Sequence, residues 1–204
     1  MIENYQKYLD FLDEKLAKFF NSQQPFIQCR KGCSKCCKMA QFPTSRIEMV
    51  YLLTGFLNTA DEKTQDIVSQ NIQNILRLRD VATDKKEFRY NCPFLINDVC
   101  SVYPYRGIIC RTFGLMTQGC DGKISVPFCC FEGMNYSSVI DSGTHMLSPE
   151  KIKTRGFEEE PLGFNVSYEY LTDKDFEETF KFQFGEKKPM IEWFINPPVT
   201  DGKK

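Results

Sequence analysis

Apolar residues recur every three or four positions near the start of the chain, with Lys and Asp residues between them. This period predicts an amphipathic helix over residues 4–20 that packs on the rest of the domain. Pro25 interrupts the pattern before the first cysteines. The apolar positions of this helix are Leu9, Leu12, Leu16 and Phe19 or Phe20.

Two more helices are predicted between the two cysteine-rich parts of the sequence. Ser45 and Glu48 have the spacing of a capping box, in which each side chain bonds the backbone N–H of the other residue. A second periodic stretch spans residues 61–80, and we expect both helices to pack together and bring the two cysteine groups face to face. The apolar positions of the two helices are Ile47, Val50, Tyr51 and Leu57, then Ile67, Val68, Ile72, Ile75 and Leu76.

The remaining segments predict loops and short helices. Gly and Pro punctuate residues 84–130, which indicates turns around one short helix near Pro104–Ile109. Ser148 before Pro149 is a helix-start signal, and residues 172–182 carry another helical pattern. The expected fold class is mainly α with irregular cysteine-rich loops. We expect a small helical domain organised around a metal centre, which would substitute for a conventional apolar core in the cysteine-rich part.

We divide the chain into three parts. An N-terminal helix occupies residues 1–25, a cysteine-cluster metal-binding domain occupies 26–140, and a C-terminal extension packed on it occupies 141–204. A chain of 204 residues with 42% hydrophobic and 26% charged residues has the composition of an ordinary globular protein.

The charge balance argues against two classes of partner. The chain has 26 Lys and Arg residues and 27 Asp and Glu residues, so a net charge of -1 gives no drive toward nucleic acid or an anionic membrane. The first residues lack the basic and apolar regions of a secretory signal. No run approaches the roughly 18 apolar residues of a membrane span. We therefore expect a cytoplasmic protein with no nucleic-acid partner and no membrane partner.

Cysteine supplies the candidate chemistry. The chain has ten cysteines, all between positions 29 and 130, and four of them form the run C-x3-C-x2-C-C at Cys29–Cys37. In a reducing compartment such a density indicates metal or redox chemistry rather than disulfides. Thiolates are soft ligands that select zinc, copper(I) and iron–sulfur clusters. Because His145 is the only histidine, the predicted site is made of cysteine alone.

Two kinds of metal centre are compatible with these cysteines, an iron–sulfur cluster and a zinc site. Two C-x2-C pairs would indicate a zinc ribbon, but the chain has only one, and its later cysteines up to Cys129 are single residues eight to ten positions apart. Ligands gathered singly from separate loops favour an iron–sulfur cluster such as 4Fe–4S. Zinc is the alternative.

Several positions besides the cysteines match a known pattern. Residues 91–95 read Asn-Cys-Pro-Phe-Leu, Tyr103 and Arg106 follow Cys100, and residues 110–114 read Cys-Arg-Thr-Phe-Gly. Over residues 29–135 the chain resembles the YkgJ-type cysteine-cluster family, a CxxCxxCC zinc- or iron-chelating domain marked by eight cysteines. The resemblance implies eight metal ligands: Cys29, Cys33, Cys36, Cys37, Cys92, Cys100, Cys110 and Cys129.

The eighth ligand is the least defined of the set. Residues 124–129 are similar to the closing motif of the family, which favours Cys129 over Cys120 and Cys130. One position departs from the family: Gly107 stands where Pro is usual after the Arg. This change is expected to loosen the turn without affecting the ligands.

Arg111 is the candidate cofactor-binding residue outside the cysteines. It follows Cys110 directly, so its charge could pair with a thiolate or with an anionic ligand near the centre. The alternative is that Arg111 forms a salt bridge on the surface. The same two interpretations apply to Arg106.

Three functional hypotheses follow from these features. The first is a module that stores, carries or senses a metal or cluster, or uses it to hold a surface for a protein partner. The second, implied by family members named flagellin lysine N-methylases, is an S-adenosylmethionine-dependent lysine methyltransferase with an iron–sulfur centre and a protein substrate. The third is disulfide exchange at Cys33 and Cys36, which leaves the other thiols without a role.

Overall fold

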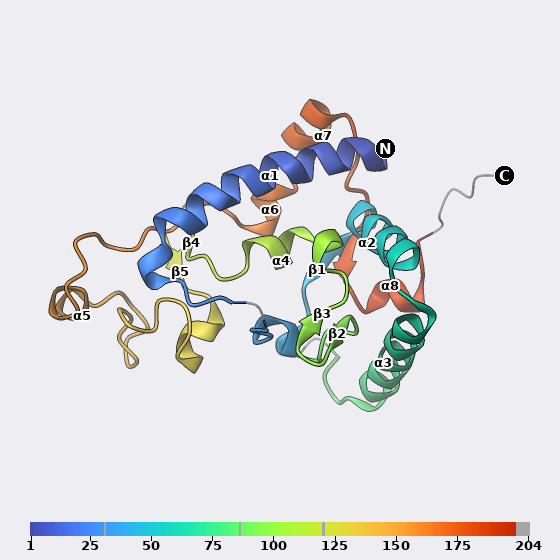
Figure 1. Cartoon of the computed structure of the whole chain (residues 1–204), viewed down its shortest axis with the longest axis horizontal. Coiled ribbons are helices and arrows are strands. Elements are labelled where there is room, and N and C mark those ends of the chain that lie inside the picture. The colour runs from blue at the N-terminus through green and yellow to red at the C-terminus, as the bar shows by residue number, and fades with distance from the viewer. Residues whose placement is uncertain (31, 86, 120, 199–204) are drawn as a thin grey trace.

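A computed structural model describes residues 1–30, 32–85, 87–119 and 121–198 of the protein (Figure 1). The predicted mainly helical fold with irregular connections is what these ranges show. The α-helices are α1 (Ile2–Ser22), α2 (Arg46–Thr59), α3 (Glu62–Val81), α4 (Ile108–Thr112), α5 (Pro149–Thr154), α6 (Tyr168–Leu171), α7 (Lys174–Phe180) and α8 (Glu192–Ile195). The 3-10 helices are η1 (Gln24–Phe26), η2 (Cys36–Met39), η3 (Tyr103–Tyr105) and η4 (Phe128–Glu132). None of the described helices combines the length and the apolar composition that crossing a bilayer requires.

Helix α1 confirms the amphipathic pattern at the start of the chain. It lies across the molecule above α4, and α6 and α7 lie along it (Figure 1). The residues that it buries follow the helical period: Tyr5, Tyr8, Leu9, Leu12 and Leu16. They share one apolar cluster with Ile108 of α4 and with Tyr168, Leu171, Phe182 and Phe184 of the C-terminal part. The first and last parts of the chain therefore meet in one core.

The predicted helix starts of α2 and α3 are confirmed. The Ser45 side chain accepts from the Glu48 N–H, and Glu48 Oε2 accepts from the Ser45 N–H at 2.8 Å, which is the full capping box. Asp61 caps α3 by accepting from the Thr64 N–H at 2.8 Å. Phe56 of α2 and Val68 of α3 then pack in one apolar cluster.

Within the described residues, three short antiparallel strand pairs lie where loops were expected. β1 (Pro43–Ser45) pairs with β6 (Lys187–Pro189), β2 (Leu95–Ile96) with β3 (Val99–Cys100), and β4 (Thr117–Gln118) with β5 (Ile124–Ser125). In β1–β6, Pro43 is opposite Pro189 and Ser45 is opposite Lys187. Asn97 and Asp98 join β2 to β3 with φ of 50° and 60°, the pair of positive angles that a type I′ hairpin turn requires.

An apolar core continues up to the cysteine-rich part of the chain. Phe94 is fully buried and Val102 nearly so, and the side chains of Cys92 and Cys100 pack against their cluster. The expectation that a metal centre replaces the apolar core there is therefore wrong, because the hairpin brings its own apolar side chains.

The buried carboxylate of Glu48 joins three parts of the fold. Besides the Ser45 N–H, it accepts from the Tyr168 hydroxyl at 2.5 Å and from the Ile108 N–H at 2.8 Å, and it is 1% exposed. These donors come from the capping box, from α6 and from the start of α4. A Cβ at Gly107 would lie 2.9 Å from Glu48 Oε1. Since three hydrogen bonds fix this carboxylate, the close approach favours glycine at position 107.

Replacing Tyr168 by Phe should destabilise the fold. The change leaves a buried carboxylate with one hydrogen-bond donor fewer, and we expect the free energy of unfolding to fall by about 1–3 kcal/mol. Urea denaturation measures it. The control is Tyr170→Phe, whose side chain is 42% exposed and should change the value by less than about 0.5 kcal/mol. Equal effects of the two substitutions would contradict the role of Glu48.

Candidate metal centre

The C-x3-C-x2-C-C run lies between two other cysteine-bearing segments. Figure 1 shows η2 between the yellow segment of η4 and the green β2–β3 hairpin. The Cys33 N–H donates to the carbonyl of Arg30 at 2.9 Å, which closes a turn, and Cys36 and Cys37 then begin η2. Successive side chains of a 3-10 helix point about a third of a turn apart. The two adjacent thiols can therefore face different neighbours.

Side-chain and backbone bonds attach this run to the β2–β3 hairpin. The Asp98 carboxylate accepts from the Ser34 hydroxyl at 2.6 Å and pairs with Lys38 at 2.8 Å. The Cys92 N–H donates to the carbonyl of Cys37 at 2.7 Å. The hairpin thus reaches the run through its turn and through the residues before its first strand.

The hairpin and α4 supply three of the predicted ligands. The Leu95 N–H donates to the carbonyl of Cys92 at 3.0 Å, and Leu95 is the strand partner of Cys100. Cys92 and Cys100 are therefore both backbone neighbours of Leu95. Cys110 follows on α4, whose first N–H, at Ile108, is held by Glu48.

The segment after β5 attaches to the opposite side of the run. Lys35 pairs with Glu132 at 2.8 Å, and Glu132 ends η4, the 3-10 helix that carries Cys129. The Met134 N–H donates back to the carbonyl of Cys129 at 3.0 Å. One residue further, the Asn135 side chain reaches the first cysteine of the run.

Asn135 is fully buried and makes three hydrogen bonds with its amide. Its Nδ2 donates to the sulfur of Cys29 at 3.1 Å and to the carbonyl of Gly114 at 2.8 Å, and its Oδ1 accepts from the Gln28 N–H at 2.7 Å. An N–H directed at a sulfur stabilises its thiolate form, and this bond opposes the effect of burial on the pKa of Cys29. No cysteine spacing indicates this residue, so the sequence analysis missed it.

The thiols are close enough to change one another's ionisation. The Cys37 thiol hydrogen-bonds Cys36, which lowers the pKa of Cys36 to about 7 and raises that of Cys37. Burial raises the pKa of six further thiols, to about 12 at two of them, Cys92 and Cys129; the others are Cys29, Cys100, Cys110 and Cys130. The negative charge of Cys36 raises it further in five residues: Cys29, Cys92, Cys100, Cys110 and Cys129.

The structure brings the predicted ligands into one region but not into bonding distance of one ion. All nine described cysteines are free thiols. Among the described residues, no group of three or more His, Cys, Asp or Glu side chains is arranged to hold a metal ion. Binding through three or more thiols therefore requires the sulfurs to draw together. The available donors are all sulfurs of reduced cysteines, which are ligands that zinc and iron accept.

Comparison with known proteins gives a family for this donor set. A family model described as "CxxCxxCC: Putative zinc- or iron-chelating domain" matches residues 28–130, just over half of the chain. The chain belongs to the CxxCxxCC family. Among curated proteins and solved structures, no significant match is found. The family resemblance seen in the sequence is thus confirmed, and its description names zinc and iron together.

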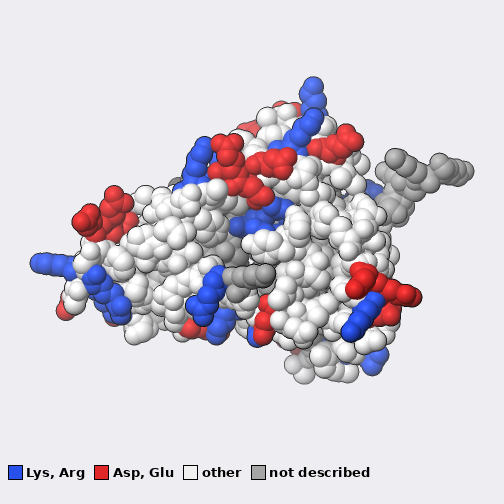
Figure 2. All heavy atoms as spheres, viewed as in Figure 1, with Lys and Arg blue, Asp and Glu red and all other residues white. Residues whose placement is uncertain are grey.

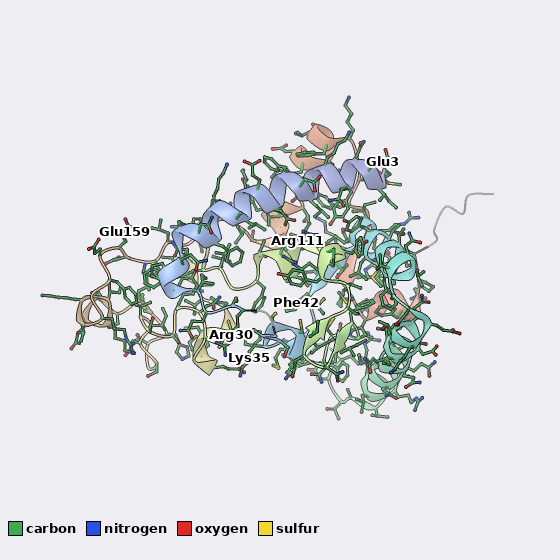
Figure 3. All side chains as sticks on the ribbon, viewed as in Figure 1. Glu3, Arg30, Lys35, Phe42, Arg111 and Glu159 are labelled. Carbon is green, nitrogen blue, oxygen red and sulfur yellow. The ribbon has the colours of Figure 1, made fainter. Side chains whose placement is uncertain are left out.

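Arg111 of this CxxCxxCC protein lies beneath α1, with its guanidinium buried (Figure 3). Nε donates to the carbonyl of Arg106 at 3.0 Å, one terminal nitrogen donates to that of Pro104 at 2.9 Å, and the other pairs with Asp13 of α1. Arg111 therefore braces α4 against the preceding turn and α1. Its role toward an anionic cofactor stays a prediction.

Arg106 is the arginine whose charge acts on the cysteines. It contributes to the low pKa of Cys36, after the Cys37 hydrogen bond, and it opposes the rise that burial causes at Cys100. Its guanidinium lies 3.8 Å from the ring centre of Tyr103, and its Nε is buried without a hydrogen-bond partner among the described residues. Figure 2 shows Lys and Arg atoms in the hollowed middle of this face. An unpartnered buried donor beside thiols fits a negatively charged occupant.

The other candidates lie apart from this network or outside the described residues. Cys130 is buried among apolar side chains such as Met116 and Tyr136, where Lys151 is the charged group that acts on its pKa. His145 is exposed and packs against Phe131 with the two rings tilted, at 4.4 Å between ring centres. Cys120 lies outside the described residues. The choice of Cys129 as the eighth ligand stays a prediction.

Replacing Gly114 by Ala should destabilise the fold more than the same replacement at Gly122. Gly114 has φ of 106°, and a Cβ there would lie 2.8 Å from Asn135 Nδ2 and 3.1 Å from Cys29 Sγ. We expect the free energy of unfolding to fall by about 1–3 kcal/mol more than in the control, because close-packed side chains must move.

The matched control is Gly122→Ala. Gly122 has φ of 77° with nothing within 4 Å of the added Cβ, so it isolates the backbone strain of about 1–2 kcal/mol. Urea denaturation of both variants without metal makes the comparison. Equal losses would mean that Asn135 and Cys29 accommodate the methyl group freely.

Proposed function

We propose that this CxxCxxCC protein binds iron as an iron–sulfur cluster through thiolates, with zinc as the other metal that the donors accept. The observation that carries the proposal is the attachment of two cysteine-bearing segments to the run 29–37, the β2–β3 hairpin by Asp98 and the η4 segment by Glu132 and Asn135. These attachments bring reduced thiols from segments far apart in sequence into one region. The proposed ligands are Cys29, Cys33, Cys36, Cys37, Cys92, Cys100, Cys110 and Cys129.

What favours iron–sulfur within the proposal is the way in which the later ligands are supplied. Cys92 lies before a strand, Cys100 ends a strand, Cys110 lies on a helix and Cys129 lies on a 3-10 helix. Iron–sulfur clusters accept ligands gathered singly from such elements. Zinc sites of the ribbon type take theirs as close pairs.

The residues around the thiols each have a definite task in this function. Asn135 and Arg106 supply donors and positive charge that offset the charge of bound thiolates. The rings of Phe42, Phe113 and Phe128 form a chain of contacts, with centres 5.7 and 5.3 Å apart, that limits water near the ligands. An iron–sulfur cluster would supply one-electron transfer, and zinc would supply structural support.

The proposal covers metal binding and not a reaction. Its supporting observations concern thiols and the groups that surround them. S-adenosylmethionine-dependent lysine methylation, and a protein partner or substrate, stay predictions of the family resemblance.

Cys110→Ser should lose bound metal and stability together, because metal binding is coupled to folding. The test is anaerobic purification, followed by iron, sulfide and zinc analysis and by optical absorption. The matched control is Cys130→Ser, a buried thiol outside the proposed ligands, which should keep the metal content of the wild type. His145→Ala should also leave it unchanged.

Two results would overturn the proposal. One is a wild-type protein that folds fully and holds neither iron nor zinc after anaerobic preparation and reconstitution with each. The other is equal metal content in Cys110→Ser and Cys130→Ser. Iron with an equivalent amount of sulfide supports the cluster, whereas zinc alone supports the other metal.

A further inference from the structure

Residues 134–136 are hydrogen-bonded to two earlier segments of the chain. The Tyr136 N–H donates to the carbonyl of Phe26 at 2.8 Å, and the Tyr136 hydroxyl accepts from the Met116 N–H at 3.2 Å. Asn135, Tyr136 and Met116 are all fully buried. The backbone beside Asn135 is therefore fixed from both segments, and its side chain has a defined place between them.

The orientation of the Asn135 amide follows from its two backbone partners. The Gln28 N–H can only donate, and it lies 2.7 Å from Oδ1, whereas the Gly114 carbonyl can only accept, and it lies 2.8 Å from Nδ2. Exchanging the oxygen and the nitrogen of the amide would break both bonds. The amide nitrogen is thus held on the side of the Cys29 sulfur, to which it donates at 3.1 Å.

Glycine at position 114 makes room for this contact. Its φ of 106° is in the region that favours glycine, and a Cβ there would lie 2.8 Å from Asn135 Nδ2 and 3.1 Å from Cys29 Sγ. The glycine backbone and the amide therefore both border the sulfur. Three segments, far apart in sequence, meet at this one atom.

Cys29 differs from the other described cysteines in its exposure. The residue as a whole is exposed, although its sulfur lies against Asn135 and Gly114. Packing alone does not restrict an exposed side chain to one rotamer. The hydrogen bond from a rigid, buried amide supplies that restriction. Asn135 lies beyond residues 28–130, the part of the chain that the family model matches.

We propose that Asn135 is the positioning residue for Cys29, and that metal binding by this thiolate depends on the hydrogen bond from Nδ2 to its sulfur. This inference rests on the proposed function. It extends the site past the matched residues, because a side chain from the following segment holds the first of the proposed ligands. Partners that hydrogen-bond a metal ligand orient it and stabilise its bound form.

Asn135→Asp in the full-length protein tests the proposal. Aspartate keeps an oxygen for the Gln28 N–H but has no donor for the sulfur. After reconstitution with zinc, the zinc affinity measured by competition with a chelator should fall about 10–100-fold. At saturating zinc, alkylation mapped by peptide mass should modify Cys29, while the other proposed ligands keep the protection that they have in the wild type.

Gln23→Glu is the matched control. Gln23 is a buried amide, 2% exposed, and its side-chain hydrogen bonds within the described residues go to Leu162 and Ser22. The change therefore places the same carboxylate in the same kind of environment without touching Cys29. It should leave the zinc affinity and the protection of Cys29 at the wild-type values, even where urea denaturation shows a loss of stability.

If Asn135→Asp does not fold, Asn135→Ser takes its place, since the short side chain leaves room for water at the Gln28 N–H and the Gly114 carbonyl. Failure of both variants to fold with zinc present would overturn the positioning role, because Asn135 would then be needed for the fold itself. Cys29 as well protected as in the wild type, or exposure of all proposed ligands together, would also overturn it and leave metal binding intact. A wild type that binds no zinc would instead contradict the proposed function, in which the donors accept zinc.

Discussion

Two opposed ion pairs hold the cysteine run in place, and their modest strength decides how the site behaves. Both Lys35–Glu132 and Lys38–Asp98 are about half exposed, and exposed ion pairs contribute little to stability. The hydrogen bonds to Cys37 and Cys29 add about 0.5–1.5 kcal/mol each. Structural zinc contributes about 10–16 kcal/mol. A metal bound by these thiols would therefore dominate the local stability, while the protein contacts select which sulfurs meet.

A second constraint lies deeper in the fold. Glu48 is a capping residue of α2, yet it also fixes the first turn of α4 and accepts from Tyr168. Cys110 lies two residues after Ile108, so the same carboxylate positions a proposed ligand and ties the C-terminal part to it. These hydrogen bonds contribute to the stability of the fold, because a buried carboxylate without hydrogen-bond donors would cost free energy. Gly107, a departure from the family pattern, fits the close approach of Glu48.

Local signals predicted the helices well. The period of α1, the capping box of α2, the periodic stretch of α3 and the Ser148–Pro149 start depend on residues within one or two turns of each other. The hairpins were missed because their strands are too short to carry an alternating pattern. The one available signal for β2–β3 was Asn97-Asp98, two residues that tolerate positive φ.

Residue type and spacing alone established that this chain carries a reduced, all-cysteine donor set within a mainly helical protein, because soft-ligand chemistry and helical periodicity are written in the residues themselves. Only the tertiary structure decided that Arg111 bonds Asp13 while Arg106 acts on the thiols, and that Asn135 donates to Cys29. These facts depend on which face each side chain presents after segments up to about a hundred residues apart have packed together. Spacing along the chain does not encode that direction.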